Sequence, residues 1–375
     1  NAIIRSVADD TVVFSPDLRD TEGDWFYWAF EVKGAAGKTV SFVMEPGYVG
    51  YFGAAVSHDL YHWNWSDTAT AANSFTYTFG ENENDVFFAH DMLYHPSRFH
   101  KFAELRGIKV KHLCDDNKGT PIPYAVIGEG KRNIILTARH HACEATGDYI
   151  MEGIIDEYLK NPIPDTRITA IPFIDADGVV AGDQGKNRRP HDHNRDYLDT
   201  IYNGVRAVKE IAGKGDVLAV FDLHSPWHIS GRNDKIFCVR NSEEKLDDMR
   251  LFGRCFEESI TPDAMKYSTK NDIDPGVEWN IGKERTETSC HRKNWSRPED
   301  ASLKGSENIL SGNEWRKQYD TRDNRLHRRH NVSARIRGNV YGERQKRLLA
   351  YVRADIRHTE RVRLPRRQPR DTDSR

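Results

Sequence analysis

The sequence predicts an α/β protein in which an N-terminal antiparallel β-sandwich precedes a mixed, mostly parallel sheet covered by helices. In residues 1–95, short runs rich in Val, Phe, Tyr and Trp are separated by Gly, Asn, Asp and Pro, which is typical of a sandwich. In residues 96–290, apolar runs alternate with longer segments of helical periodicity, which is typical of strands buried on both faces. Residues 291–375 show neither pattern, so we expect two folded domains and a separate tail.

The N-terminal domain is expected to contain six short strands. Their predicted positions are Thr11–Ser15, Asp24–Val32, Lys38–Met44, Tyr51–Ser57, Ser74–Phe79 and Asp85–Ala89. The aromatic run between Trp25 and Phe30 offers faces on which a sugar could stack, but a small β-domain needs such residues for its core. We favour the core interpretation for this run.

The second domain is expected to begin with a linker helix in residues 91–105. Strands and helices then alternate, which predicts a largely parallel sheet with its functional site at the strand-end loops. The predicted strands are Ile108–His112, Tyr124–Ile127, Asn133–Ala138, Ile168–Ile174, Val217–Phe221 and Lys235–Val239, and the helices are Thr146–Leu159 and Tyr197–Ala212.

Charge is unevenly distributed along the chain. The formal net charge is −2, but residues 291–375 carry +12, so the first 290 residues carry −14. Nineteen of the last 85 residues are Arg. The sequence therefore predicts a disordered tail, a basic arm for anionic partners, or a stretch that does not naturally continue this fold.

The five cysteines are scattered and lack paired spacing, which argues against structural disulfides and favours a cytoplasmic protein. The chain has no run of 18 apolar residues, so no membrane span is predicted. Its first residue is Asn rather than Met, so a processed N-terminus is also compatible with the sequence.

The predicted strand Asn133–Ala138 runs into a polar turn that carries His141 and Glu144. A His and a carboxylate three residues apart at a strand end can bind one metal ion, and both ligand types suit Zn²⁺. A catalytic zinc site needs a third protein ligand. The candidate is His224, which closely follows the predicted strand Val217–Phe221.

Other interpretations compete at each of these positions. His140 is a rival ligand because it is adjacent to His141, and a single His at a strand end is often an ordinary surface residue. A carboxylate such as Glu144 near a helix N-terminus is stabilised by the helix dipole without any metal. Cys143 lies inside the motif, and we expect it to fill space as a small apolar side chain.

Three motifs, taken together and in this order, resemble the core motifs of zinc carboxypeptidases of the funnelin type. They are ARHHACEATGDYIMEG, GVVAGDQGKNRRPHDHNRDY and VFDLHSPW. The nearest resemblance is to the bacterial branch similar to cytosolic carboxypeptidases, in which a small β-domain precedes the catalytic domain. It implies one zinc ion per chain, held by His141, Glu144 and His224, and hydrolysis of a C-terminal peptide bond by a metal-activated water.

The resemblance also implies that Asn194 and Arg195 bind the terminal carboxylate of a substrate. A guanidinium suits this task because it forms bidentate hydrogen bonds with a carboxylate. The competing interpretation is a solvated loop or a basic patch for an anionic polymer. The Asp, His and Asn residues between the cations argue against a nucleic-acid partner.

A second cation is needed to polarise the scissile carbonyl and stabilise its oxyanion. Arg188 is predicted for this role, with Lys186 and Arg189 as the alternatives in the same loop. Asp222, two residues before His224, is predicted to orient the imidazole of that ligand.

The general base that the resemblance requires is predicted to be Glu287. Members of the family carry this Glu on a late apolar strand, and no convincing apolar run follows Gly282 in this chain. Glu278 and Glu284 are therefore alternatives, and each of the three is also compatible with an ordinary exposed residue.

The predicted function is a zinc metallocarboxypeptidase that acts on a peptide or peptide-like substrate with a free carboxylate. The alternatives are an amidase or deacylase on the same scaffold, acting on cell-wall peptides or N-acyl amino acids, and a catalytically inactive zinc- or peptide-binding protein. We expect His191, His193 and His228 to be structural or supporting residues. The sequence does not predict the residue removed, the oligomeric state or the role of the N-terminal domain.

Overall fold

The computed structural model describes most of the first 273 residues. The described residues are 1–23, 25–49, 53–66, 69–71, 73–225, 236–240, 246–259, 267–273 and 362–363. Glu278, Glu284, Glu287 and His228 lie outside them, as does the basic tail apart from residues 362–363. Within this described part, no helix is both long and apolar enough to span a membrane.

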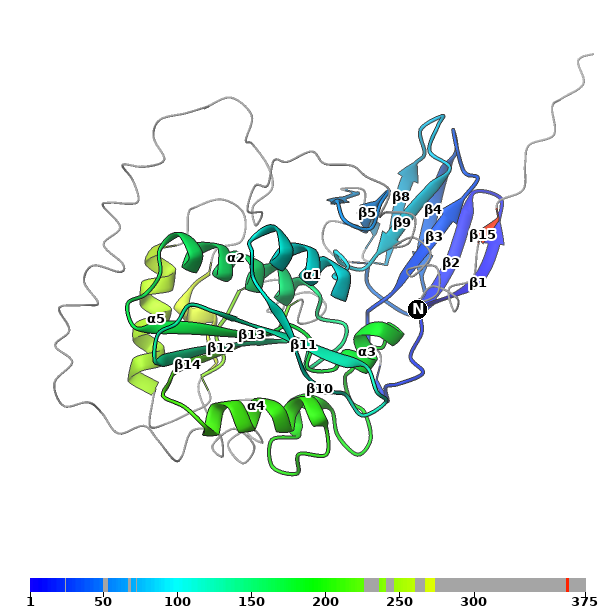
Figure 1. Cartoon of the computed structure of the whole chain (residues 1–375). Helices are drawn as coiled ribbons and strands as arrows, with labels where there is room; N and C mark the ends of the chain where they lie inside the picture. Colours follow the sequence, from blue (N-terminus) through cyan, green and yellow to red (C-terminus); the bar gives the residue numbers. More distant parts are fainter. Residues whose placement is uncertain are drawn as a thin grey trace, which may run out of the picture.

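Two five-stranded sheets form the N-terminal domain (Figure 1). One has the strand order β1-β2-β4-β8-β7 and the other β15-β3-β9-β5-β6. Most neighbours are antiparallel, whereas β2 pairs in parallel with β4 and β3 with β15. The bounds are β1 Ala2–Ala8, β2 Thr11–Pro16, β3 Ala29–Lys33, β4 Thr39–Met44, β5 Ala55–Ser57, β6 Trp63–Trp65, β7 Ala69–Ala71, β8 Ser74–Thr78, β9 Asp85–Ala89 and β15 Val362–Arg363.

Aromatic side chains fill the space between these two sheets. The ring of Phe14 lies 4.8 Å from that of Trp28, and Phe42 lies 5.1 Å from Phe88, measured between centroids. Trp28 and its neighbours Phe26 and Phe30 are buried. The core interpretation of this aromatic run is therefore confirmed for Trp28 and Phe30, whereas Phe26 packs with Tyr27 and with Cys143 of the second domain.

One predicted strand is shorter than expected because part of it contacts the second domain. The strand expected at Asp24–Val32 begins only at Ala29. The backbone N–H of Tyr27 donates to the side chain of Gln184, and its carbonyl accepts from the same side chain. This part of the N-terminal domain therefore pairs with a loop of the second domain instead of with a strand.

The second domain is built on a sheet of order β10-β11-β13-β12-β14. Strand β12 (Arg132–Ala138) pairs in parallel with β13 (Thr166–Ile171) on one side and with β14 (Val217–Leu223) on the other. Strands β10 (Val110–Asp115) and β11 (Pro121–Ile127) complete the sheet in antiparallel pairs. The predicted architecture, an antiparallel sandwich followed by a mixed sheet, is confirmed.

Helices cover both faces of this sheet. Helices α1 (Pro96–Leu105) and α2 (Thr146–Lys160) lie on one face and α4 (Asn203–Gly213) on the other (Figure 1). Strand β12 is consequently buried along almost its whole length, which explains the apolar run Ile134–Leu136 at its centre. Two further helices are α3 (Ala176–Ala181) and α5 (Leu246–Ser259).

Two predicted elements differ from the structure. The helix expected from Tyr197 begins only at Asn203, because the carboxylate of Asp196 accepts the backbone N–H groups of Ile201 and Tyr202 and holds a turn there. Of the strand expected at Lys235–Val239, only Val239 pairs within the described residues, in an isolated bridge.

Candidate metal centre

The parallel pairing of β12 with β14 brings the three predicted metal ligands together. Thr137 lies opposite Asp222 in this register, so both strands end at the same edge of the sheet. The Nδ1 atom of His141 lies 3.1 Å from one carboxylate oxygen of Glu144, and the Nδ1 atom of His224 lies 2.6 Å from the other. Ligand atoms of all three residues lie within 4.8 Å of one another.

The second nitrogen of each imidazole faces a different carboxylate. The Nε2 atom of His224 lies 2.7 Å from Asp222 Oδ2, and the Nε2 atom of His141 lies 3.7 Å from Asp192 Oδ1. In metal sites, a carboxylate on the far nitrogen fixes the tautomer and the direction of the ring. Two oriented imidazoles and one carboxylate form a donor set that fits zinc.

The pKa values of Glu144 and His224 at this centre are strongly shifted from their usual values. Burial raises the pKa of Glu144, but Lys186, His141 and His224 outweigh burial and hold that pKa well below its usual range. Burial lowers the pKa of His224, but Asp222 and Glu144 overcome it and raise the pKa to about 10. A metal ion bound here would therefore displace a proton from His224.

His140, the rival ligand, has a different position. Its Nε2 atom lies 2.8 Å from the hydroxyl of Tyr197, and its Nδ1 atom lies 2.9 Å from Asp222 Oδ1. Although His140, Asp222 and His224 also lie within 4.8 Å of one another, the contacts of His140 are with Tyr197 and Asp222, whereas His141 and His224 both contact Glu144. We therefore infer that His140 holds Asp222 in place and is not a metal ligand.

A third buried group consists of Asp116, Asp175 and His193, whose ligand atoms also lie within 4.8 Å of one another. Here the guanidinium of Arg188 lies 2.6 Å from Asp175 Oδ2, so positive charge is already present.

The turn that carries His141 and Glu144 is built around a buried arginine. Arg139 is only 2% exposed and has a positive φ of 60°. Its Nε donates to the carbonyl of Ala142 at 2.8 Å, and its Nη1 lies 3.0 Å from Asp148 Oδ2 at the start of α2. Arg139 thus ties the turn to the helix that follows it.

We expect Arg139→Met to destabilise the second domain by about 3–5 kcal/mol, because the buried carboxylate of Asp148 would lose its partner. Chemical denaturation followed by circular dichroism measures this loss. Lys214→Met is the control, since Lys214 forms an exposed pair with Glu210 that is worth under about 1 kcal/mol. An equal effect of the two substitutions would contradict the assignment.

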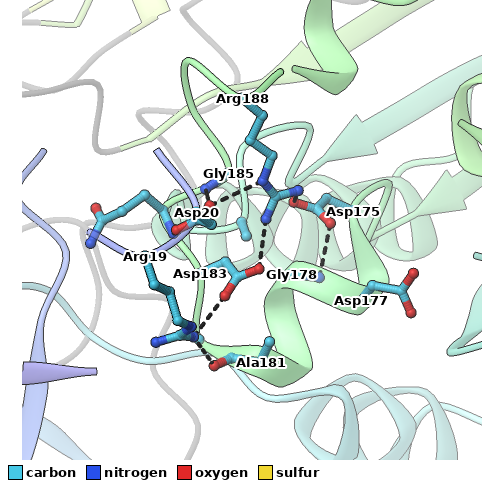
Figure 2. A network of polar contacts seen from close by, with 12 residues as sticks. Arg19, Asp20, Asp175, Asp177, Gly178, Ala181, Asp183, Gly185 and Arg188 are labelled. Atoms are coloured by element: carbon cyan, nitrogen blue, oxygen red, sulfur yellow. Dashed lines mark hydrogen bonds and ion pairs between the residues drawn. The ribbon is translucent and has the colours of Figure 1, made fainter. Parts of the chain in front are cut away.

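The structure does not bring Arg188, the predicted oxyanion cation, to the metal centre. Its three guanidinium nitrogens lie 3.0 Å from Asp20, 2.6 Å from Asp175 and 2.9 Å from Asp183 (Figure 2). The alternative cation, Lys186, is buried instead beside the ligands, with its Nζ 2.5 Å from Glu144 Oε1. Three competing carboxylates explain why Arg188 turns away.

The predicted carboxylate-binding pair lies on the other side of the centre. Arg195 is half exposed and lies 2.6 Å from Asp192, the same carboxylate that faces His141. Asn194 is buried, and among the described residues its Oδ1 atom has no hydrogen-bond partner. Asp192 therefore connects the candidate substrate-binding residue to the candidate metal ligand.

An open cleft of about 930 Å³ lies beside these residues. Its lining consists of Glu22, Asn187, Arg188, Arg189, Pro190, His191, Asp192 and Arg195. A substrate carboxylate in this cleft would meet the exposed guanidinium of Arg195.

Sequence reasoning did not include Asp192 among the site residues. The one feature of the sequence that points to Asp192 is its position two residues before Asn194. The two described histidines of this loop have supporting contacts, since His191 lies 2.7 Å from Asp196 and His193 stacks on Tyr202.

The chain was compared with protein families, with curated proteins and with solved structures. No protein-family model matches the chain. An uncharacterised protein of Zymomonas mobilis is 24% identical over 238 residues, which cover 58% of this chain and 63% of that protein. Cytosolic carboxypeptidase 2 of Danio rerio is 23% identical over 242 residues, which cover 56% of this chain and 31% of that protein. The chain therefore spans less than two thirds of either relative.

Solved structures share the fold. A metallo-carboxypeptidase from Burkholderia cenocepacia aligns with a TM-score of 0.61 at 17% identity, covering 77% of this chain and 84% of that one. A metallo-carboxypeptidase from Pseudomonas aeruginosa, in complex with (2-guanidinoethylmercapto)succinic acid, aligns with a TM-score of 0.58 at 18% identity, covering 76% and 84%. The predicted resemblance is confirmed: the chain has a metallo-carboxypeptidase fold and is related in sequence to the cytosolic carboxypeptidases.

Proposed function

We propose that this protein is a zinc-dependent carboxypeptidase that hydrolyses the C-terminal peptide bond of a substrate with a free carboxylate. The observation that carries the proposal is the convergence of the Nδ1 atoms of His141 and His224 on the two oxygens of Glu144. These three residues would hold one zinc ion per chain. Zinc bound there supplies a water of lowered pKa and polarises the scissile carbonyl.

The surrounding side chains hold these ligands in place. Asp222 lies within hydrogen-bond distance of the Nε2 atom of His224, so the Nδ1 atom of that ring stays directed at Glu144. Asp192 lies 3.7 Å from the Nε2 atom of His141 and adds negative charge beside that ring. The ammonium of Lys186, rather than the guanidinium of Arg188, is the cation close enough to act at this centre. We therefore give Lys186 the role of stabilising the developing oxyanion.

Substrate recognition and proton transfer fall to other residues. Arg195, with Asn194 beside it, binds the terminal carboxylate at the cleft, because its exposed guanidinium can form two parallel hydrogen bonds. The general base is Glu287, which takes a proton from water and returns it to the leaving amine. Glu287 lies outside the described residues, and the support for this role is the family resemblance alone.

A panel of three substrates tests the proposal. It contains a peptide with a free C-terminus, the same peptide with an amidated C-terminus, and an N-acyl amino acid. The proposal expects chelator-sensitive release of the terminal residue from the free peptide and no cleavage of the amidated one. Cleavage of the N-acyl amino acid alone would favour the deacylase. Absence of turnover on all three would favour an inactive binding protein.

We also propose that the protein acts in the cytoplasm. Two observations support this assignment: the similarity to proteins named cytosolic carboxypeptidases and the free thiols of Cys114, Cys143 and Cys238. A reducing compartment keeps such thiols unpaired.

A further inference from the structure

Residues 17–23 and 25–27 of the N-terminal domain lie directly against the loop 181–189 of the second domain. Arg19 donates to the carbonyl of Ala181 at 2.6 Å and pairs with Asp183 at 2.7 Å (Figure 2). The backbone N–H of Glu22 donates to the carbonyl of Asn187 at 3.3 Å. The segment thus contacts this loop at both ends, and Lys186 lies between them.

Asp20 accepts three hydrogen bonds across this interface. One of its carboxylate oxygens accepts the backbone N–H of Gln184 at 2.9 Å. The other accepts the backbone N–H of Gly185 at 2.8 Å and the Nε of Arg188 at 3.0 Å. A single carboxylate from the N-terminal domain therefore contacts both Gly185 and Arg188 (Figure 2), which stand on either side of Lys186 in the sequence.

Two further side chains reinforce this arrangement. Gln184 is fully buried, and its side chain exchanges two hydrogen bonds with the backbone of Tyr27. The ring of Trp25 lies 4.8 Å from the Nζ of Lys186, a distance at which an aromatic face attracts an ammonium group. The ammonium is consequently held between the N-terminal domain and Glu144.

The same loop packs on the turn that carries the metal ligands. The backbone N–H of Cys143 donates to the carbonyl of Gln184 at 3.2 Å. Gly185 has a φ of +73°, and a Cβ atom there would lie 2.2 Å from the backbone nitrogen of Ala142. Only glycine allows this approach. A shift of the loop would therefore move Lys186 relative to Glu144.

We propose that the N-terminal domain completes the active site, with Asp20 as a positioning residue that sets the ammonium of Lys186 at Glu144 through residues 184–188. The proposal rests on the proposed function only where it concerns turnover. It gives the N-terminal domain a direct part in the hydrolytic step, beyond support of folding.

The test is Asp20→Asn in the full chain. Asparagine keeps the size of the side chain but has one acceptor oxygen in place of two, so it cannot hold both backbone N–H groups and Arg188. We expect kcat to fall by about 10- to 100-fold, because a small misplacement of a catalytic group costs about that much. KM and the zinc content should change little. Asp10→Asn is the matched control, since Asp10 is an exposed residue of the same domain.

A double-mutant cycle separates positioning from a general loss of structure. If Asp20 acts through Lys186, Asp20→Asn should lower kcat much less in a Lys186→Met background than in the original chain. Equal effects in both backgrounds would overturn the proposal. Trp25→Leu removes the ring beside Lys186 but leaves every contact of Asp20, and it should lower kcat in the same direction. If Asp20→Asn does not fold, this second variant tests whether the N-terminal domain acts on Lys186, and an unchanged kcat would overturn the proposal.

Hydrogen exchange provides a readout that needs no turnover. Asp20→Asn should speed exchange of the backbone amides of Gln184 and Gly185 and leave those of β12 unchanged. If the unaltered protein proves inactive on every substrate, this measurement still tests the contact, so failure of the proposed function is distinguishable. Unchanged exchange at both amides, together with an unchanged kcat, would overturn the proposal.

Discussion

Replacing His141 by alanine is expected to remove the bound zinc and to lower turnover by at least about 10³-fold. The reason is that a catalytic zinc site of this type has only three protein ligands, and His141 is one of the two imidazoles directed at Glu144. Loss of the ion removes both the activated water and the polarised carbonyl. Elemental analysis and a peptide hydrolysis assay on the same sample measure the two effects together.

The control for this substitution is His112→Ala. His112 is exposed on β10 and pairs with Asp115 at 2.8 Å, so its loss should leave zinc content and turnover unchanged. His140→Ala distinguishes the two adjacent histidines, because His140 contacts Asp222 and we expect it to hold Asp222 in place without binding the metal. If zinc were retained in His141→Ala and lost in His140→Ala, the ligand assignment would be wrong.

Lys186→Met is expected to lower kcat by about 10²- to 10³-fold while the protein keeps its zinc. This is the usual effect of removing one group that stabilises an oxyanion, and Lys186 is the cation beside Glu144. Zinc should stay bound, because the ion itself supplies the positive charge that the carboxylate of Glu144 needs. Steady-state kinetics with parallel metal analysis measures the outcome.

The matched control is Lys160→Met, since Lys160 is exposed at the end of α2. It should leave kcat unchanged. A Lys186→Met protein with full kcat would show that this lysine neutralises charge without taking part in hydrolysis. The oxyanion role would then need another residue.

The fold was predictable where side-chain periodicity determines it. The apolar run Ile134–Leu136 in β12 indicates a strand buried on both faces, and the helical spacing of α2 predicts its packed face. The limits of other elements depend on contacts far away in the sequence. Residues 25–28 have strong strand propensity, yet Gln184 binds the backbone of Tyr27, and no local pattern reveals that contact.

The convergence of His141, Glu144 and His224 was predictable for a similar reason. Two strand ends in a parallel sheet meet at one edge, so the predicted strands before His141 and His224 already indicate that these residues are neighbours. The choice among Lys186, Arg188 and Arg189 was not predictable. It depends on carboxylates such as Asp20, which is 168 positions away from Arg188 in the chain.

The most direct test of this account is the metal content of the purified full-length protein after incubation with zinc and extensive dialysis. We predict one tightly bound zinc ion per chain, and we predict that a chelator removes the ion and the hydrolysis of peptides with a free C-terminus together. A folded chain that retains no zinc while His141, Glu144 and His224 are intact would contradict the account.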